Sequence, residues 1–286
     1  MRATSNIAAT ELHTERFLAA VADPARPIIE ANDVAIVVAH PDDETIGCGA
    51  LLPRLRDAKL ILVTDGAPRN LFDATNYGFA SAEAYAQARR RELEHALGLA
   101  GVSSNAVTRL DIPDQQAGEN LAVITRRLVE LFTHWRTAIA ITHAFEGGHP
   151  DHDSAAFAIT AAAKLLARNG QRVGVVEFPL YRADVSGRAR QSFVAHPDRP
   201  EIEILLSDHE RALTQRMAAM HATQRGLLKA FPFTVERFRR APPYDLAALP
   251  NDGRLLYEQY DWGMRGERWL TLASAALREL GLQDSA

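Results

Sequence analysis

Two short segments of this chain carry side chains that could bind a metal and move a proton. The first, His40-Pro41-Asp42-Asp43-Glu44, follows the apolar run 34–38, which is typical of a buried parallel strand. Pro41 cannot donate a sheet hydrogen bond, so we expect the chain to turn here. In open α/β sheets, ligands bind outside the carboxyl ends of the strands. An imidazole and two adjacent carboxylates at that point are unfavourable unless something cationic or reactive is held there, which indicates a functional site.

The second segment repeats this arrangement after another candidate strand, residues 137–142. His149 and His152 lie three residues apart, with glycines before them and Pro150 between them, and a helical run follows at Ser154. Borderline divalent metals such as zinc favour imidazole with carboxylate, and catalytic sites leave one coordination position open for water. His40, Asp43 and His152 would supply such a three-ligand set.

These residues resemble those of the PIG-L/LmbE-like N-deacetylases. The resemblance rests on three motifs: His40-Pro41-Asp42-Asp43-Glu44 with Gly47-Cys48-Gly49, Val63-Thr64-Asp65-Gly66, and His149-Pro150-Asp151-His152. Weaker similarities are Arg89 with Glu92, Ile112-Pro113-Asp114, and His221-Ala222-Thr223-Gln224. Two His-Pro-Asp motifs in this order and spacing are specific, whereas each weaker similarity alone is not. Together they cover residues from about 34 to 224.

The resemblance implies a role for each central residue. His40, Asp43 and His152 would hold zinc, with another divalent metal such as Fe²⁺ as an alternative. Asp42 would act as the base. His149 would assist at the oxyanion or the leaving group, and we expect it to do so as a cation.

Other polar residues near the motifs are weaker candidates. Arg69 and Asp114 follow strand ends and could contact substrate, although solvated loop charges explain them nearly as well. Asp151 could contact substrate, orient His149 or cap the following helix. His143 ends a strand directly but fits no motif position. Some sugar-specific family members carry a tyrosine two residues before the assisting histidine, where this chain has Gly147.

Strand and helix patterns alternate along the chain, which predicts a single Rossmann-like α/β domain with a parallel sheet and helices on both faces. Predicted strands are residues 34–38, 59–64, 106–112, 137–142, 172–178 and 202–206, and predicted helices are 11–22, 81–97, 121–135, 154–167 and 208–229. We expect an N-terminal arm or helix at 1–33, a deacetylase core at 34–230, and a C-terminal extension at 231–286 that packs on the core. His196-Pro197-Asp198 repeats the motif letters, but it lacks a preceding strand and a later histidine, so a simple turn is expected.

Composition excludes several classes of protein. The net charge of −4 argues against a nucleic-acid binder. Cys48 is the only cysteine, so no intramolecular disulfide can form. No apolar run approaches the ~20 residues that span a bilayer, and the start shows no basic segment followed by an apolar core. We therefore expect a cytoplasmic enzyme with a small-molecule N-acetylated substrate, no nucleic acid and no membrane span; a homo-oligomer is left open.

The predicted function is removal of an N-acetyl group from an N-acetylated amino sugar of the GlcNAc type, or its conjugate, by metal-activated water. One alternative is a metal amidase or esterase of the same fold that acts on a non-sugar secondary metabolite. A second alternative is a metal-free nucleotide-binding domain. Its Gly-x-Gly-x-x-Gly signature is incomplete here, because Leu52 stands at the last glycine position.

Overall fold

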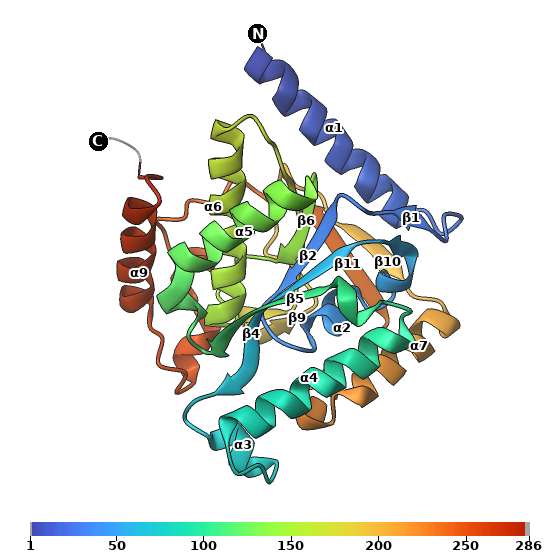
Figure 1. The fold of residues 1–286 in the computed structure, drawn as a ribbon, viewed down its shortest axis with the longest axis vertical. Coiled ribbons are helices and arrows are strands. Elements are labelled where there is room, and N and C mark those ends of the chain that lie inside the picture. Colours follow the sequence, from blue (N-terminus) through green and yellow to red (C-terminus); the bar gives the residue numbers. More distant parts are fainter. Residues whose placement is uncertain (1, 284–286) are drawn as a thin grey trace.

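The computed structural model describes residues 2–283, which form a central β-sheet with helices on both faces (Figure 1). Seven strands of these residues pair in the order β10 (Ile202–Leu205), β11 (Val235–Arg240), β7 (Gly174–Phe178), β6 (Ile139–His143), β2 (Val34–Val38), β4 (Lys59–Pro68) and β5 (Val107–Asp114). From β7 to β5 all neighbours are parallel, whereas β10 and β11 are antiparallel. The predicted fold class is thus confirmed, with two antiparallel strands added at one edge.

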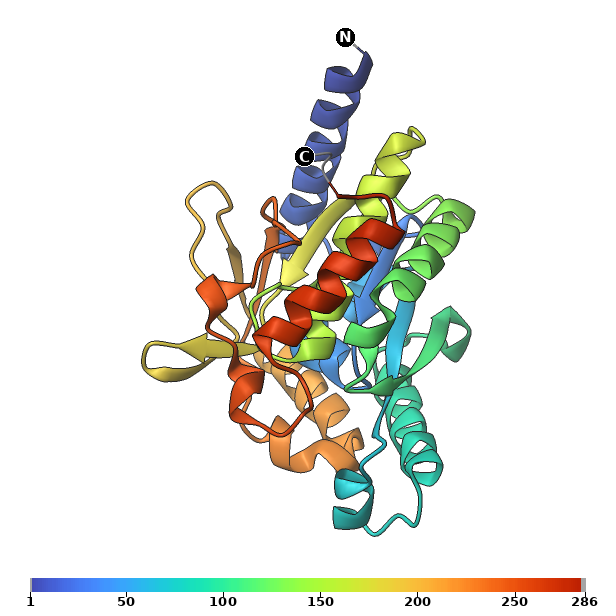
Figure 2. The same cartoon turned by 90° about the vertical axis from the view of Figure 1, so that its left-hand side faces the viewer.

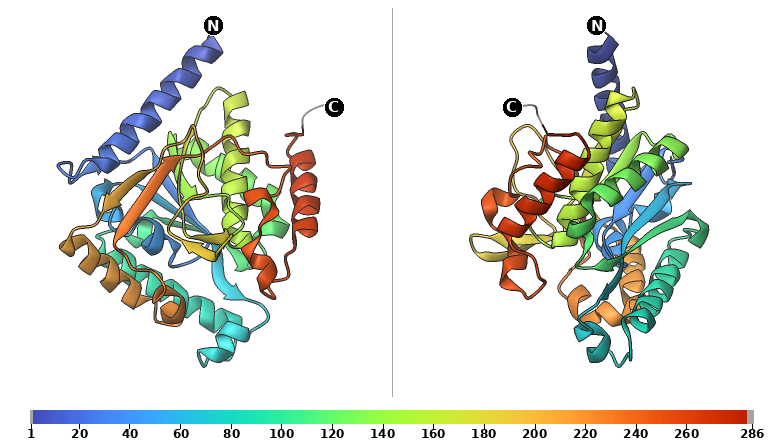
Figure 3. Two further views of the ribbon diagram at one scale, coloured as in Figure 1. Left: turned by 180° about the vertical axis from the view of Figure 1, so that it is seen from behind. Right: turned by 60° about the vertical axis from the view of Figure 1, so that its left-hand side comes forward.

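The central strand β2 is buried on both faces because its side chains alternate between two apolar layers. Ile36 and Val38 join one cluster, which contains residues of helices α1, α4 and α7, and Val37 joins another, which contains residues of α5 and α6. Figures 2 and 3 show these helix layers from further sides. The helices are α1 (Arg2–Ala22), α2 (Asp43–Cys48), α3 (Phe72–Asn76), α4 (Ala82–Leu99), α5 (Leu121–Trp135), α6 (Pro150–Arg168), α7 (Asp208–Met220), α8 (Arg225–Leu228) and α9 (Gly266–Glu279).

Two pairs of short strands lie apart from the main sheet. β1 (Ile29–Glu30) pairs with β3 (Leu55–Arg56), and β8 (Tyr181–Asp184) pairs with β9 (Gly187–Arg190) as a hairpin. No helix within residues 2–283 is long and apolar enough to cross a membrane.

The division into arm, core and extension stays a prediction. Strand β11 lies in the segment predicted as the C-terminal extension, yet it pairs with β7 of the predicted core. Helix α9 packs beside α5 through Trp269 and neighbouring apolar residues. Residue 1 and residues 284–286, the outer ends of the predicted arm and extension, lie outside the described residues.

Three predicted helix boundaries are wrong. Helix α1 begins at Arg2 rather than at residue 11. The helix predicted at 208–229 ends at Met220, because His221 has a non-helical backbone (φ −83°, ψ 65°) and the next turn is a 3-10 turn. There, the Thr223 amide and hydroxyl both donate to the Glu92 carboxylate. Helix α6 begins at Pro150 rather than at residue 154, because proline fits the first helical position. His152 therefore lies in the first turn of a helix.

Candidate active site

The first histidine-rich turn leaves the end of β2 with a strained backbone. Asp42 has φ 137° and ψ −23°, a conformation that disfavours a residue with a side chain and costs about 1–3 kcal/mol. Two local hydrogen bonds hold it: the His40 amide donates to Asp43 Oδ2 (2.7 Å), and the Asp42 amide donates to Glu44 Oε2 (3.0 Å). Strain held by the surrounding structure is a feature of functional sites.

The second turn is a relaxed helix start. His149 is the N-cap of α6, and its Nδ1 accepts a hydrogen bond from the Asp151 amide (3.1 Å). Because β2 and β6 are parallel neighbours in the sheet, the loops that follow them meet at the same edge.

The predicted metal ligands lie together. His40 Nδ1 is 3.2 Å from His152 Nε2 and 3.3 Å from Asp43 Oδ2, and His152 Nε2 is 3.3 Å from Asp43 Oδ1. In a tetrahedral zinc site with metal–ligand distances near 2.05 Å, ligand atoms lie about 3.3 Å apart, so these residues fit a divalent metal. His143 and His149 also bring ring nitrogens within 4.8 Å of members of this cluster.

A second layer of carboxylates fixes the His40 ring. Its Nε2 lies 3.2 Å from Asp151 Oδ2 and 3.3 Å from Asp114 Oδ1. Asp151 in turn accepts the amides of Gln115 (2.6 Å) and Ala117 (3.0 Å). Carboxylates behind a ligand histidine select its tautomer and orientation, and here they direct the proton to Nε2 and leave Nδ1 free to bind.

Asp42 is held apart from this ligand set. Its carboxylate is buried beside Arg89, with Arg89 Nη2 3.2 Å from Asp42 Oδ2. Burial raises the pKa of Asp42 to about 7, although the Arg89 charge acts to lower it. A carboxyl with a pKa near neutrality can accept a proton and return it, as a general base requires.

The structure favours a neutral His149, which differs from the expected cation. Burial holds the pKa of its imidazole well below the usual value, and the neighbouring His40 and His152 lower it further. Because Nδ1 accepts the Asp151 amide, the ring proton belongs on Nε2, from which a neutral imidazole can still donate.

The structure places the remaining predicted site residues in two different surroundings. Asp114 and Asp151 belong to the buried cluster, whereas Arg69 is exposed and pairs with Asp65 (2.6 Å). Arg69 is not among the residues that line the cavity at this site.

His143 and Arg89, which contact the central cluster, were not among the predicted site residues. His143 Nε2 accepts the Ala39 amide (2.9 Å), and its ring stacks on His152 with centroids 4.2 Å apart. Arg89 donates to Gly66 O (2.6 Å) and Pro41 O (2.8 Å) as well as to Asp42. His143 could have been predicted from its position at a strand end, and Arg89 from its weak similarity to the family.

A cavity of about 300 Å³ opens onto this cluster. It is lined by His40, Asp42, Asp43, Asp73, Arg89, Asp114, Gln115, His149, Tyr181, Arg188, Gln224, Leu227, Tyr260 and Trp262. One wall is aromatic: the rings of Tyr260 and Trp262 stack with centroids 4.4 Å apart, and Trp262 lies 4.5 Å from the His149 ring.

Gly147 explains how the C-terminal segment reaches this cavity. Its φ is +70°, and a Cβ here would lie 2.9 Å from Leu255 Cδ2. The Leu256 amide donates to Gly147 O (2.7 Å). The space beside Gly147, where some family members carry a tyrosine, is therefore filled by the segment that leads to Tyr260 and Trp262.

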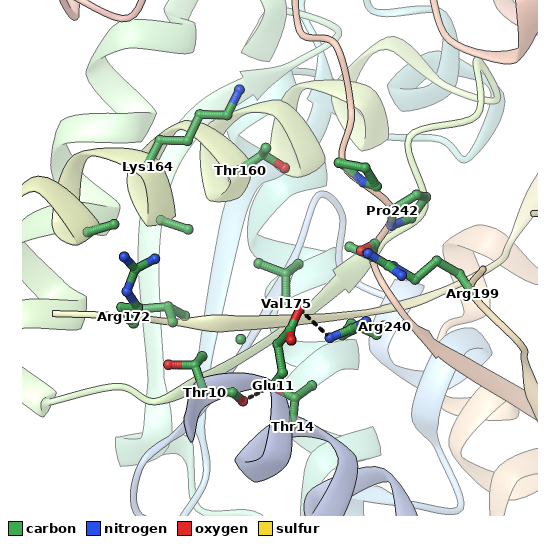
Figure 4. A pocket seen from close by; sticks show the side chains of 16 residues that line it. Thr10, Glu11, Thr14, Thr160, Lys164, Arg172, Val175, Arg199, Arg240 and Pro242 are labelled. Carbon is green, nitrogen blue, oxygen red and sulfur yellow. Dashed lines mark hydrogen bonds and ion pairs between the residues drawn. The ribbon is translucent and has the colours of Figure 1, made fainter. Parts of the chain in front are cut away.

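Another cavity, of about 320 Å³, lies at the opposite end of β7, against α1 and the second half of α6 (Figure 4). Its charged residues are mostly basic, and Arg240 Nη1 pairs with Glu11 Oε1 (2.9 Å). None of the predicted site residues lines it, so the candidate chemistry belongs to the first cavity.

A protein-family model matches the part of the chain that contains the site. The model of the PIG-L family, described as GlcNAc-PI de-N-acetylase, matches residues 35–163, which include both histidine-rich turns. This match agrees with the family that the motifs predicted, and it supports a hydrolase of the N-deacetylase class. A search of curated proteins found no match.

Solved structures share the fold. The A40926 pseudoaglycone deacetylase Dbv21 superposes with a TM-score of 0.58 at 16% identity, covering 76% of this chain and 99% of that one. Teicoplanin deacetylase Orf2, in its zinc-inhibited form, gives 0.57 at 14% identity, covering 74% and 99%. N,N'-diacetylchitobiose deacetylase from Pyrococcus horikoshii gives 0.55 at 18% identity, covering 81% and 92%.

Proposed function

We propose that this protein is a metal-dependent N-deacetylase that removes an acetyl group from an N-acetylated amino sugar or its conjugate. The observation that carries the proposal is the spacing of His40 Nδ1, His152 Nε2 and the Asp43 carboxylate, 3.2–3.3 Å apart, beside the buried Asp42. The structures of deacetylases with sugar-related substrates share this fold, which agrees with the proposal.

His40, Asp43 and His152 would hold the metal. A divalent ion such as zinc, or Fe²⁺ as the alternative, would act as a Lewis acid and lower the pKa of a water to about 7. The three residues would remain unprotonated at their ligand atoms, and Asp114 and Asp151 would keep the His40 proton on Nε2.

Asp42 would move the protons. Its carboxylate accepts a proton from the attacking water and later delivers it to the leaving nitrogen, so the amide C–N bond breaks and a free amine and acetate result. Arg89 holds the carboxylate through Nη2 and is itself anchored on two backbone carbonyls. The pKa of about 7 suits a group that must work in both directions.

His149 would stabilise the oxyanion as a neutral donor. The bond from the Asp151 amide to Nδ1 leaves Nε2–H as the donor. Preorganised donors of this kind contribute about 3 kcal/mol to the transition state. The ring packs against Trp262, which holds it in the cavity.

The cavity supports a sugar substrate better than a nucleotide. Tyr260 and Trp262 offer a broad aromatic surface beside the reacting groups, against which the apolar face of a sugar ring can pack. Gly47, part of the incomplete dinucleotide signature, has a packing explanation: a Cβ there would lie 2.3 Å from Phe178 Cδ2.

Metal retention with a matched control tests the proposal. We expect His152→Ala to lose the metal and the deacetylation of N-acetylated sugars while keeping its circular dichroism spectrum. His134→Ala, an exposed histidine on α5, should retain both. Undiminished metal affinity in His152→Ala would show that the ligand set is wrong.

A further inference from the structure

Arg188 carries a charge that no acid of the described chain neutralises. It lies on the hairpin formed by β8 and β9, and within residues 2–283 no carboxylate oxygen lies within 4 Å of its guanidinium. Other arginines near the cavity are paired: Arg182 lies 3.8 Å from Glu146, and Arg89 lies 3.2 Å from Asp42. Arg188 is thus available to a ligand in a way that these two are not.

Two tyrosines hold Arg188 at the cavity. Its Cζ lies 5.2 Å from the Tyr181 ring centre and 5.3 Å from the Tyr260 ring centre, and Nη2 donates to the Tyr260 hydroxyl. Cation–π contacts of this type fix a guanidinium without neutralising it. A guanidinium has five N–H donors in a planar fork, so most of them remain free for a carboxylate or a phosphate.

The charges around Arg188 make this position selective. Asp42, Asp43, Asp73 and Asp114 line the reacting end of the same cavity, where Arg89 and the proposed metal offset their charge. Arg188 lies with Tyr260 on the aromatic side of the cavity. A neutral sugar would leave the Arg188 charge unpaired, whereas an anionic substituent on that side would pair with it.

We propose that Arg188 binds an anionic substituent, a phosphate or a carboxylate, on the amino-sugar substrate, and that it selects anionic substrates over neutral ones. This inference rests on the proposed deacetylase function, since it names the substrate class of the same cavity. A phosphate and a carboxylate both present oxygen atoms that can accept two N–H donors from one guanidinium.

The test is a ratio of specificity constants. kcat/KM is measured for N-acetylglucosamine, for N-acetylglucosamine 1-phosphate and for N-acetylmuramic acid, which carries a carboxylate. We expect the parent to prefer at least one anionic sugar, and Arg188→Gln to lower the anionic-to-neutral ratio by about 10–100-fold, the range of a charge-assisted hydrogen bond. Arg188→Lys should keep part of the preference, because it keeps the charge but loses the fork.

Arg190→Gln is the matched control, since Arg190 is exposed on the same hairpin and does not line the cavity. Arg190→Gln should keep the anionic-to-neutral ratio of the parent. The anionic sugar with the higher kcat/KM in the parent shows whether Arg188 binds a phosphate or a carboxylate. An equal loss on neutral and anionic sugars in Arg188→Gln, or no anionic preference in the parent, would overturn the inference. A parent that holds metal but deacetylates none of the three sugars would overturn the amino-sugar function, and the inference with it.

Discussion

The chain contains His-Pro-Asp at residues 40, 149 and 196, and the two copies in the site differ in conformation. In the second copy the histidine Nδ1 accepts the amide of the aspartate two residues later (3.1 Å), and the third copy, a turn outside the cavity, makes the same bond (3.2 Å). In the first copy, His40 Nδ1 faces Asp43 and His152 instead. The tripeptide therefore has a common local hydrogen bond, and the copy that departs from it is the one whose Nδ1 is left available to a metal.

The aspartates of the two turns have opposite surroundings. Asp151 is helical and accepts two backbone amides, which hold its carboxylate behind His40, although burial raises its pKa as well. Asp42, in the strained turn, has only Arg89 as a charged hydrogen-bond partner among the described residues, and its pKa rises to about 7. The Asp151 carboxylate is positioned to hold the His40 ring and the Asp42 carboxylate to exchange a proton, although both aspartates follow the same two residues.

The largest expected effect is that of removing the carboxylate of Asp42. Asp42→Asn should lower kcat by about 10²–10⁴-fold, because an amide cannot accept the proton of the attacking water. Metal content should stay at the parent level, since Asp42 is not one of the proposed ligands. The measurements are kcat on one good substrate and metal analysis of the purified variant. Equal loss of metal and of turnover would refute the separation of base from ligands.

Asp151→Asn should give a smaller and different loss. The amide cannot accept the backbone amides of both Gln115 and Ala117, and it removes the charge behind His40. We expect metal affinity to fall by about 10–100-fold and the free energy of unfolding to fall by about 1–3 kcal/mol. At saturating metal, most of the turnover should return. Competition with a chelator measures metal affinity, and urea unfolding measures the free energy of unfolding. If excess metal does not restore turnover, Asp151 has a direct catalytic role.

Sequence patterns predicted the parts of this site that depend on one strand and its following turn. The strand at 34–38, the parallel neighbour at 137–142 and the two motifs were enough to bring His40, Asp43 and His152 to one edge of the sheet. Arg89 and His143 were harder, because their roles depend on which buried groups face them across the fold. The aromatic wall could not be predicted, since Tyr260 and Trp262 reach the cavity through tertiary packing, including that of residue 255 on Gly147.

The first turn also differs from the second because a buried carboxyl group lies at the end of α2, the short helix that follows it. The Ala50 amide, just past α2, donates to the buried Glu236 (2.6 Å), and burial raises the pKa of Glu236 to about 8. The folded protein thus binds this proton more tightly than the unfolded chain, whose value is near 4.5. Stability from this group is intact below pH 4.5 and falls, by up to a few kcal/mol, as the pH rises from there to about 8.

Glu236→Gln should flatten that part of the pH profile, because the amide carries no charge to desolvate. Urea unfolding at acidic and mildly alkaline pH measures the slope, and Glu15→Gln, an exposed glutamate on α1, is the control that should keep the parent slope. If the slope in Glu236→Gln equals that of the parent, this carboxyl is already ionised without penalty, and the pH dependence belongs to other groups.

The smallest expected effect is that of His196→Ala, which we compare with the same change at His149, since both histidines make the same local bond. His196→Ala removes the bond to the Asp198 amide in a turn outside the cavity, so the free energy of unfolding should change by no more than about 0.5 kcal/mol and kcat should not change. His149→Ala removes the equivalent bond together with a ring in the cavity, and it should lower kcat by about 10²-fold or more with little change in KM. The difference between the two variants isolates the contribution of the His149 ring from that of the local turn. If His149→Ala changes only stability, and by as little as His196→Ala, then the second motif contributes His152 alone to the chemistry, and oxyanion stabilisation must come from elsewhere in the cavity.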